Sequence, residues 1–248
     1  RAAPAGLSPE ALLRVWESGS RQHPLDRALA ILAAATPGAP WESLAAETIG
    51  RRDAGLLQVH AATFGSRLPA VADCPVCGAT VEFVVDVASL QETLADARGA
   101  QAEHQLSCEG ISLVFRLPTS HTLAAALAGG TLEDARARLI AQCVVRAEQH
   151  GVALPASALP EAVLARLAAR MSELDPGLEI AFAIPCAGCD HQWRALLDIG
   201  AYLWQEICAQ SRRLLRETAT LARAYGWREA DILALSPVRR QAYLDLAP

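Results

Sequence analysis

Lysine and asparagine are absent from this chain of 248 residues, and all 22 of its basic residues are arginine. Without lysine the chain has no P-loop lysine, no Schiff-base lysine and no Ser-Lys dyad, which excludes three routes to nucleotide binding or nucleophilic catalysis. The richness in alanine, leucine and arginine is typical of mutational bias in a GC-rich genome. With 52% hydrophobic residues, 20% charged residues and a formal net charge of -5, the chain is expected to be a folded, soluble protein.

Long apolar runs are also missing. Near the start, the stretch from Ala28 to Trp41 lacks charged side chains, but Pro37, Gly38 and Pro40 interrupt it, and a membrane span needs roughly 20 apolar residues. No signal peptide is visible, so we expect no membrane partner and a cytoplasmic site of synthesis. The strings G-x-G-x-x-G, G-x-S-x-G and H-E-x-x-H are absent as well, and we therefore expect no enzymatic activity.

Four of the seven cysteines form two C-x-x-C pairs, Cys74/Cys77 and Cys186/Cys189. Two intervening residues allow both thiolates of a tight turn to face one ion, and two such turns complete a tetrahedral shell for Zn²⁺. Residues 78–185 separate the pairs, whereas a spacing of roughly 15–20 residues is common, so a folded helical insertion is expected between them. Because four protein ligands leave no open coordination position, the pattern predicts one structural zinc ion rather than a catalytic one.

Two alternatives stay open for these cysteines. A redox role of the thioredoxin type requires an exposed thiol of low pKa at a helix N-terminus, and neither pair precedes a helical pattern. The cysteines could also be thiols without a metal, or thiols paired with one another. His191 could replace one thiolate, although four cysteines already suffice. Cys108, Cys143 and Cys208 lie in apolar or amphipathic contexts and are expected to be small buried side chains.

Periodicity and capping residues predict a mostly helical α+β protein, with a zinc ribbon whose two knuckles are separated by the helical insertion. Strands are expected around both cysteine pairs and in a hairpin over residues 105–115, and a helix from about Thr131 to Gln149. A long amphipathic helix follows from about Ile199 to Ala224. The predicted organisation is an N-terminal helical region (1–66), a first knuckle with β-hairpins (67–117), a helical insertion (118–177), a second knuckle (178–198) and a C-terminal helical region (199–248).

Basic residues concentrate in the C-terminal region. Arg212 lies about 180° from Leu203 on a helical wheel, so the long helix combines an apolar face with a cationic outer face. This outer face is either simply solvated, or a docking surface for an acidic partner, or a surface for nucleic acid. Nucleic acid is disfavoured because phosphate binding needs clustered cations, which the knuckles do not offer. The candidate partner-binding residues are Arg212, Arg213, Arg216 and Trp227.

Several short motifs follow one another in a characteristic order. They are Leu25-Asp26-Arg27-Ala28-Leu29, then Cys74-Pro-Val-Cys77-Gly with Glu82-Phe83, then Phe115-Arg116-Leu117-Pro118-Thr119-Ser120, then Cys186-Ala-Gly-Cys189 with Trp193, and finally Tyr225-Gly226-Trp227 with residues 232–244. In this order the chain resembles the T4-type baseplate hub assembly chaperone family of contractile-tailed phages. Similar proteins accompany phage-tail-like contractile injection systems in bacterial genomes.

This resemblance implies a non-enzymatic assembly chaperone or a minor structural component of a phage-like baseplate, with hub or spike proteins as partners. It implies a location in the bacterial cytoplasm during assembly, or in the assembled phage-tail-like particle. No catalytic residues come with the family, and some members lack the knuckles, so the metal site depends on the four cysteines of this chain. The alternatives are a nucleic-acid-associated zinc-ribbon protein and an enzyme or thiol redox protein.

Overall fold

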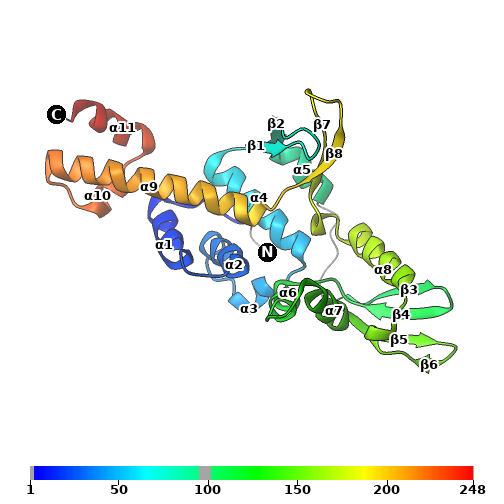
Figure 1. Ribbon diagram of the computed structural model, residues 1–248. Coiled ribbons are helices and arrows are strands. Elements are labelled where there is room, and N and C mark those ends of the chain that lie inside the picture. Colours follow the sequence, from blue (N-terminus) through cyan, green and yellow to red (C-terminus); the bar gives the residue numbers. More distant parts are fainter. Residues whose placement is uncertain (1–2, 95–101, 248) are drawn as a thin grey trace.

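Both ends of the chain contribute to the helical core in this computed structural model, which describes residues 3–94 and 102–247 (Figure 1). Residues 95–101, within the predicted segment 67–117, lie outside the described part, as do residues 1, 2 and 248. The protein is α+β and mostly helical, as expected. The N-terminal helices are α1 (Pro9–Gly19), α2 (Pro24–Ala35), α3 (Trp41–Ala45) and α4 (Ile49–Phe64).

The longest helix, α9 (Ile199–Tyr225), lies across α1, α2 and α4 (Figure 1). Asp198 caps its start by accepting a hydrogen bond from the amide of Ala201, and Gly226 ends it in the left-handed conformation, with φ of 69°. Its buried residues recur on one face, which confirms the predicted amphipathic pattern. They include Leu203, Ile207, Leu214 and Leu221.

Two short helices complete the C-terminal end, α10 (Glu229–Leu233) and α11 (Pro237–Leu246). Figure 1 shows them beside the last turns of α9. A nearly buried ion pair contributes to this packing, because Arg240 Nε of α11 lies 2.7 Å from Glu217 Oε2 of α9. The described helices include none that is both long enough and apolar enough to cross a lipid bilayer.

Each cysteine pair lies at the turn of its own antiparallel hairpin. The first hairpin consists of β1 (Arg67–Asp73) and β2 (Thr80–Asp86), and α5 (Val87–Leu94) follows it. The second consists of β7 (Ala181–Pro185) and β8 (Gln192–Leu196). The strands of the two hairpins belong to separate two-stranded sheets, so side chains rather than a shared ladder connect them.

A smaller unit lies between the two hairpins in the sequence. Its four-stranded antiparallel sheet has the order β3 (His104–Cys108), β4 (Ile111–Phe115), β5 (Val144–Gln149), β6 (Val152–Ala153). The helices α6 (Ser120–Ala126), α7 (Leu132–Cys143) and α8 (Glu161–Leu174) accompany it, with 3₁₀ turns η1 (Ala156–Ala158) and η2 (Pro176–Leu178). Apolar side chains of the sheet and of α8 form its core, including Ile111, Leu113, Phe115, Val163 and Leu167.

The prediction of a helix from Thr131 to Gln149 is wrong over its last six residues. The helix α7 ends at Cys143, and Val144–Gln149 forms the strand β5, which pairs with β4. The residues of β5 favour a helix by composition, but pairing satisfies the backbone of β4 and buries Ala147 beneath the sheet. The segment between the knuckles is therefore not helical alone, and its sheet joins strands from both sides of the boundary predicted at residue 117.

Candidate metal centre and partner surface

The turn of the first hairpin is closed by two backbone hydrogen bonds. The amide of Cys74 donates to the carbonyl of Ala79, and the amide of Gly78 donates to the carbonyl of Cys74, both at 2.9 Å. Gly78 has φ of 71°, a left-handed conformation that glycine adopts without a steric penalty. This geometry turns both side chains of the pair to the same side of the hairpin.

The turn of the second hairpin repeats the same arrangement. The amide of Cys186 donates to the carbonyl of His191 at 2.9 Å, and the amide of Asp190 donates to the carbonyl of Cys186 at 3.0 Å. Asp190 takes the place of the left-handed glycine, with φ of 55°. The amide of Gly188 also donates to Cys186 Sγ at 3.3 Å, and amide donors of this kind stabilise a thiolate.

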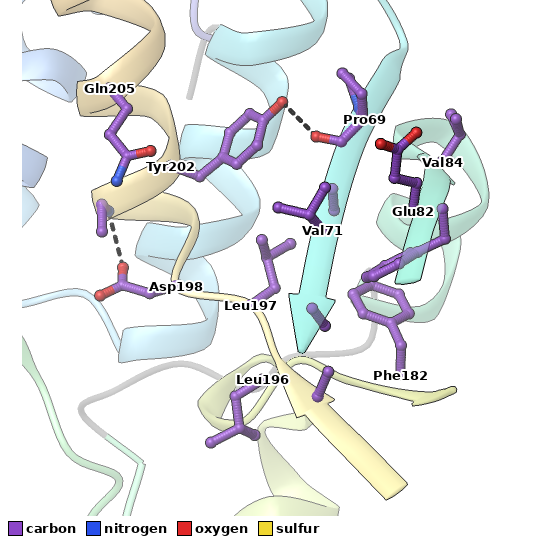
Figure 2. A pocket seen from close by; sticks show the side chains of 15 residues that line it. Pro69, Val71, Glu82, Val84, Phe182, Leu196, Leu197, Asp198, Tyr202 and Gln205 are labelled. Carbon is purple, nitrogen blue, oxygen red and sulfur yellow. Dashed lines mark hydrogen bonds between the residues drawn. The ribbon is translucent and has the colours of Figure 1, made fainter. Parts of the chain in front are cut away.

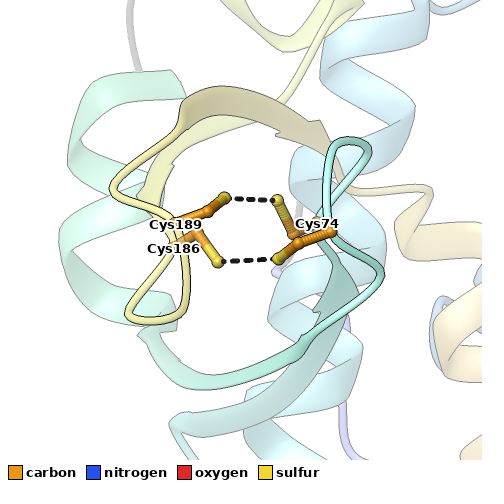
Figure 3. A group of neighbouring side chains, drawn as sticks. Cys74, Cys186 and Cys189 are labelled. Atoms are coloured by element: carbon orange, nitrogen blue, oxygen red, sulfur yellow. Dashed lines mark hydrogen bonds between the residues drawn. The ribbon is translucent and has the colours of Figure 1, made fainter.

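The structure brings the four predicted cysteines together (Figure 3). Their sulfur atoms all lie within 4.8 Å of one another. Two contacts join the turns, with 3.7 Å between the sulfurs of Cys74 and Cys189 and 3.5 Å between those of Cys77 and Cys186. Cys74 and Cys186 are buried, whereas Cys77 and Cys189 are exposed. The group could therefore hold a metal ion at the edge of the molecule.

The thiols in this group differ in acidity. Desolvation disfavours the Cys74 thiolate, but hydrogen bonds from the amides of Cys77 and Val76 and from neighbouring thiols outweigh it and lower the pKa of Cys74 to about 7. The amide of His191 favours the Cys189 thiolate, yet hydrogen bonding with Cys77, together with desolvation, raises the pKa of Cys189 to about 12. The cluster thus accommodates one negative charge readily, and further ionisation needs a cation to balance it.

The imidazole of His191 is not one of the grouped ligand atoms, and neither cysteine pair lies at a helix terminus. The ring of His191 stacks on Trp193, with 6.3 Å between the centroids and 7° between the planes. Both cysteine pairs lie between two strands, whereas thiols of the thioredoxin type lie at a helix N-terminus. The geometry therefore favours shared ligation of an ion over the redox alternative.

The remaining cysteines lie away from this group. Cys143 is buried, as expected, and burial raises its pKa to about 11. Cys108 and Cys208 are only half-buried, so the expectation of full burial is wrong for these two. Desolvation also raises the pKa of Cys208. A thiol with a raised pKa is a poor nucleophile near neutral pH.

Aromatic contacts connect the hairpins to each other and to the helical core. The rings of Phe83 on β2 and Phe182 on β7 have centroids 6.0 Å apart. The hydroxyl of Tyr202 on α9 donates a hydrogen bond of 2.9 Å to the carbonyl oxygen of Pro69 on β1. These contacts attach the first hairpin to the second hairpin and to α9.

The predicted cationic face lies on the outer side of α9. Arg212, Arg213 and Arg216 are all exposed, and we call these three residues the arginine face. Arg213 Nε lies 2.6 Å from Glu217 Oε1, one turn further along the same helix. The charge of Arg213 is thus already paired within α9. In this pair the Arg213 side chain is exposed to solvent, whereas the Glu217 side chain is largely buried.

Trp227 lies just after α9 and is half-buried. Its ring stacks on Tyr225 with centroids 4.8 Å apart, and it meets Tyr243 of α11 edge-on at 4.8 Å. The candidate partner-binding residue Trp227 is therefore part of an aromatic cluster that packs α11 against the end of α9, with one part of its surface still accessible.

Two contributions to the cysteine turns were missed in the sequence. They are the amide of Gly188, which donates to the sulfur of Cys186, and the left-handed backbone of Asp190. The glycine within the second C-x-x-C pair is the visible signal for the first. Alignment of the two turns, with Gly78 and Asp190 at corresponding positions, is the signal for the second.

A model of the family described as T4 bacteriophage base plate protein matches residues 42–200, which is more than half of the chain and includes all four cysteines. The match ends at the start of α9, so the C-terminal motifs and the arginine face lie beyond it. No curated protein and no solved structure gives a match. The family match over both hairpins, the smaller unit and part of the helical core shows that the chain belongs to the T4 bacteriophage base plate protein family.

Proposed function

We propose that the protein has a structural or assembly role in a phage-like baseplate, as a hub assembly chaperone or a minor structural component, and that it is not an enzyme. The family match over residues 42–200 carries this proposal. Its partners are then other baseplate subunits, among them hub or spike proteins of a contractile tail or injection system. It acts in the bacterial cytoplasm during assembly, in the assembled particle, or in both.

The four-sulfur group would hold one structural Zn²⁺ ion in a zinc ribbon. Zn–S bonds of about 2.3 Å in a tetrahedron place the sulfurs about 3.8 Å apart, and the sulfurs of Cys74 and Cys189 lie 3.7 Å apart. Four thiolates would complete the coordination shell, which leaves no position for a substrate. The bound ion would stabilise the fold, because it would cross-link the β1–β2 turn to the β7–β8 turn. These two turns flank the smaller unit in the sequence.

The arginine face and Trp227 would form the surface for an acidic region of a baseplate partner. Arg212 and Arg216 are exposed, and their guanidinium groups could form bidentate hydrogen bonds to carboxylates. The chain as a whole is acidic, with a net charge of -5, so this local cationic surface stands out against the rest. Surface charges of this kind chiefly increase the association rate and set the choice of partner.

Quantitative mass spectrometry of purified tail-like particles and of the soluble lysate tests the proposal, with the protein tagged. Enrichment in particles at a fixed ratio to baseplate subunits would identify a structural component, and presence only in soluble complexes with hub proteins would identify a chaperone. Association with neither would overturn the proposal. The double variant Arg212→Ala, Arg216→Ala should reduce this association, whereas Arg166→Ala, at an exposed arginine on α8, should not.

The same variants also test whether the protein binds nucleic acid. A zinc-ribbon protein that binds nucleic acid would bind heparin with a steep dependence on salt, and loss of Arg212 and Arg216 would lower the salt concentration of elution. The charged residues near the cysteine turns are largely acidic, including Asp73, Glu82 and Asp190, and they oppose phosphate binding there. Salt-steep binding to duplex or single-stranded DNA would overturn the preference for a protein partner.

A further inference from the structure

An apolar groove of about 740 Å³ lies between the first hairpin and the beginning of α9 (Figure 2). Both faces of the β1–β2 hairpin contribute to its lining, with Ala70 and Phe83 from the face that packs against the helical core. Because Val71 pairs with Glu82 and Pro69 pairs with Val84 in the antiparallel register, these four side chains lie on one face of the hairpin. Figure 2 shows Tyr202 and Leu197 on the opposite side of the groove from this face.

Large apolar side chains around the groove remain exposed to solvent in the folded protein. The exposed fraction is 68% for Val71, 50% for Val84 and 69% for Leu196 at the end of β8. Three large aliphatic side chains that remain this accessible around one hollow form a contiguous apolar patch. Such patches on folded proteins mark sites where another protein binds.

The charged groups that line the groove all have one sign. Glu82 and Asp198 are the charged lining residues, and arginine is absent from the lining among the described residues. Asp198 uses Oδ1 to cap α9, which leaves its second oxygen available to a ligand. Within the described part of the chain, Glu82 forms no ion pair. An apolar segment that carries a cationic side chain would complement this groove in both respects.

A neighbouring hollow of about 590 Å³ repeats the pattern on the other side of β2. It shares Glu82, Phe83, Val84 and Phe182 with the groove, and it adds Asp86 as its second charged lining residue. The two hollows therefore flank the contact between Phe83 and Phe182 and carry acidic groups only, within the described residues. The linings of both hollows are thus apolar and acidic, and the exposed Arg67, which pairs with Asp86 in the register of β1 and β2, belongs to neither lining.

We propose that the groove binds an apolar segment of a partner protein that bears at least one lysine or arginine. Aliphatic side chains of this segment contact Val71, Val84 and Leu196, and its cationic group pairs with Glu82. This proposal deepens the proposed baseplate function and rests on it for the identity of the partner as a baseplate subunit. The surface is separate from the arginine face, which would bind an acidic partner region, so the protein could contact two subunits of opposite charge.

Selection from a display library of random 12-residue peptides against the full-length protein tests this proposal. The enriched peptides should combine several large apolar residues with at least one lysine or arginine. Fluorescence anisotropy should then show at least tenfold weaker binding of these peptides to Val71→Glu and to Leu196→Glu. The matched control is Val152→Glu on β6, where the valine is 67% exposed, and it should bind as the unchanged protein does.

A charge reversal at the same site gives an independent measurement. Glu82→Arg should shift the selected peptides from basic to acidic, and Glu82→Gln should weaken binding of the basic peptides and reduce its salt dependence. Because Glu82 is exposed, these variants test the groove even if Val71→Glu unfolds in a thermal melt. Failure of the unchanged protein to enrich any basic apolar peptide, or equal binding of the enriched basic peptides to Val71→Glu and Val152→Glu in their folded states, would overturn the proposal.

The particle experiment separates this inference from the proposed function. If the tagged protein associates with particles or hub complexes but the selected peptides bind independently of Val71 and Glu82, only the groove proposal is wrong. If the protein associates with neither, whereas the peptides require the groove, the baseplate function is wrong and the groove remains a binding site for basic apolar segments.

Discussion

The backbone amide of Gly50 donates a hydrogen bond of 3.0 Å to Oδ2 of Asp175, and the two residues lie 125 positions apart in the sequence. Gly50 is in the first turn of α4, where unpaired amides and the helix dipole favour an anionic partner. Asp175 follows α8 and is completely buried. This contact therefore attaches the smaller unit to the helical core at a site that excludes water.

Gly50 should not tolerate a side chain. A Cβ atom at this position would overlap with the carboxylate of Asp175, and the backbone of Gly177 also packs closely against Gly50. We expect Gly50→Ala to lower the free energy of unfolding by about 2 kcal/mol, because overpacking forces the two segments apart. Urea unfolding followed by circular dichroism measures the change.

Gly55 of the same helix provides the matched control. A Cβ atom there would meet only the flexible end of Leu32, at 3.1 Å, and alanine favours a helix over glycine by roughly 0.5–1 kcal/mol. Gly55→Ala should therefore leave stability unchanged or raise it slightly. Equal effects of Gly50→Ala and Gly55→Ala would show that the contact between α4 and Asp175 contributes little to the attachment of the smaller unit.

Removal of one cysteine should abolish tight metal binding. Cys77→Ser leaves three thiolates and an incomplete shell, so zinc content should fall well below one ion per chain when elemental analysis follows purification. Structural zinc sites contribute on the order of 10 kcal/mol at neutral pH, and the melting temperature of the variant should fall markedly. A chelator should produce a similar loss in the unchanged protein.

Cys208→Ser is the control for this experiment, because Cys208 is half-buried on α9 and lies outside the four-sulfur group. It should retain one zinc ion per chain and a nearly unchanged melting temperature. A protein purified with stoichiometric zinc in spite of Cys77→Ser would contradict ligation by the four cysteines.

The two cysteine turns should respond oppositely to substitution at their left-handed positions. Gly78→Ala should destabilise the protein by about 1 kcal/mol, because a side chain is unfavourable at φ of 71°. Asp190→Gly should relieve the corresponding strain at φ of 55°. Gly188→Ala is the control, since its Cβ atom would meet no neighbour closer than 3.6 Å. Urea midpoints at a fixed zinc concentration measure all three, and a stabilising effect of Gly78→Ala would contradict the shared turn geometry.

His60 should make stability depend on pH. It is buried beside Phe64 and Tyr202, its Nδ1 atom has no hydrogen-bond partner, and desolvation lowers its pKa despite an opposing hydrogen bond with the backbone of Gly65. The folded state therefore resists protonation, whereas the unfolded chain takes up a proton near its ordinary pKa of 6.5. This contribution to stability is complete above pH 6.5 and is lost as the pH falls below that value.

His60→Phe removes the titrating group, so the urea midpoint should decline less steeply between about pH 6.5 and 5 than in the unchanged protein. Acid release of a bound metal affects both proteins and cancels in the comparison. His150→Asn, at an exposed position, should keep the steeper slope of the unchanged protein. Identical slopes for His60→Phe and the unchanged protein would assign the pH dependence to other groups.

Features that depend on neighbouring residues could be predicted from the sequence. Ser8, Thr48 and Asp198 each cap the helix that follows them, because a capping side chain reaches an amide only three residues away. The amphipathic pattern of α9 and its end at Gly226 depend in the same way on local spacing. The C-x-x-C spacing likewise identified which cysteines come together, because two turns that each present two thiols supply the four ligands of one tetrahedral metal site.

Features that depend on distant partners were decided only by the tertiary structure. The segment Val144–Gln149 has helical composition, yet the open edge of β4 offers it backbone hydrogen bonds and a buried position for Ala147. The contact of Gly50 with Asp175 and the groove beside Val71 likewise join segments far apart in the chain. Composition and short spacing record the local preferences of a segment, but the free energy of these contacts arises only when the chain is folded.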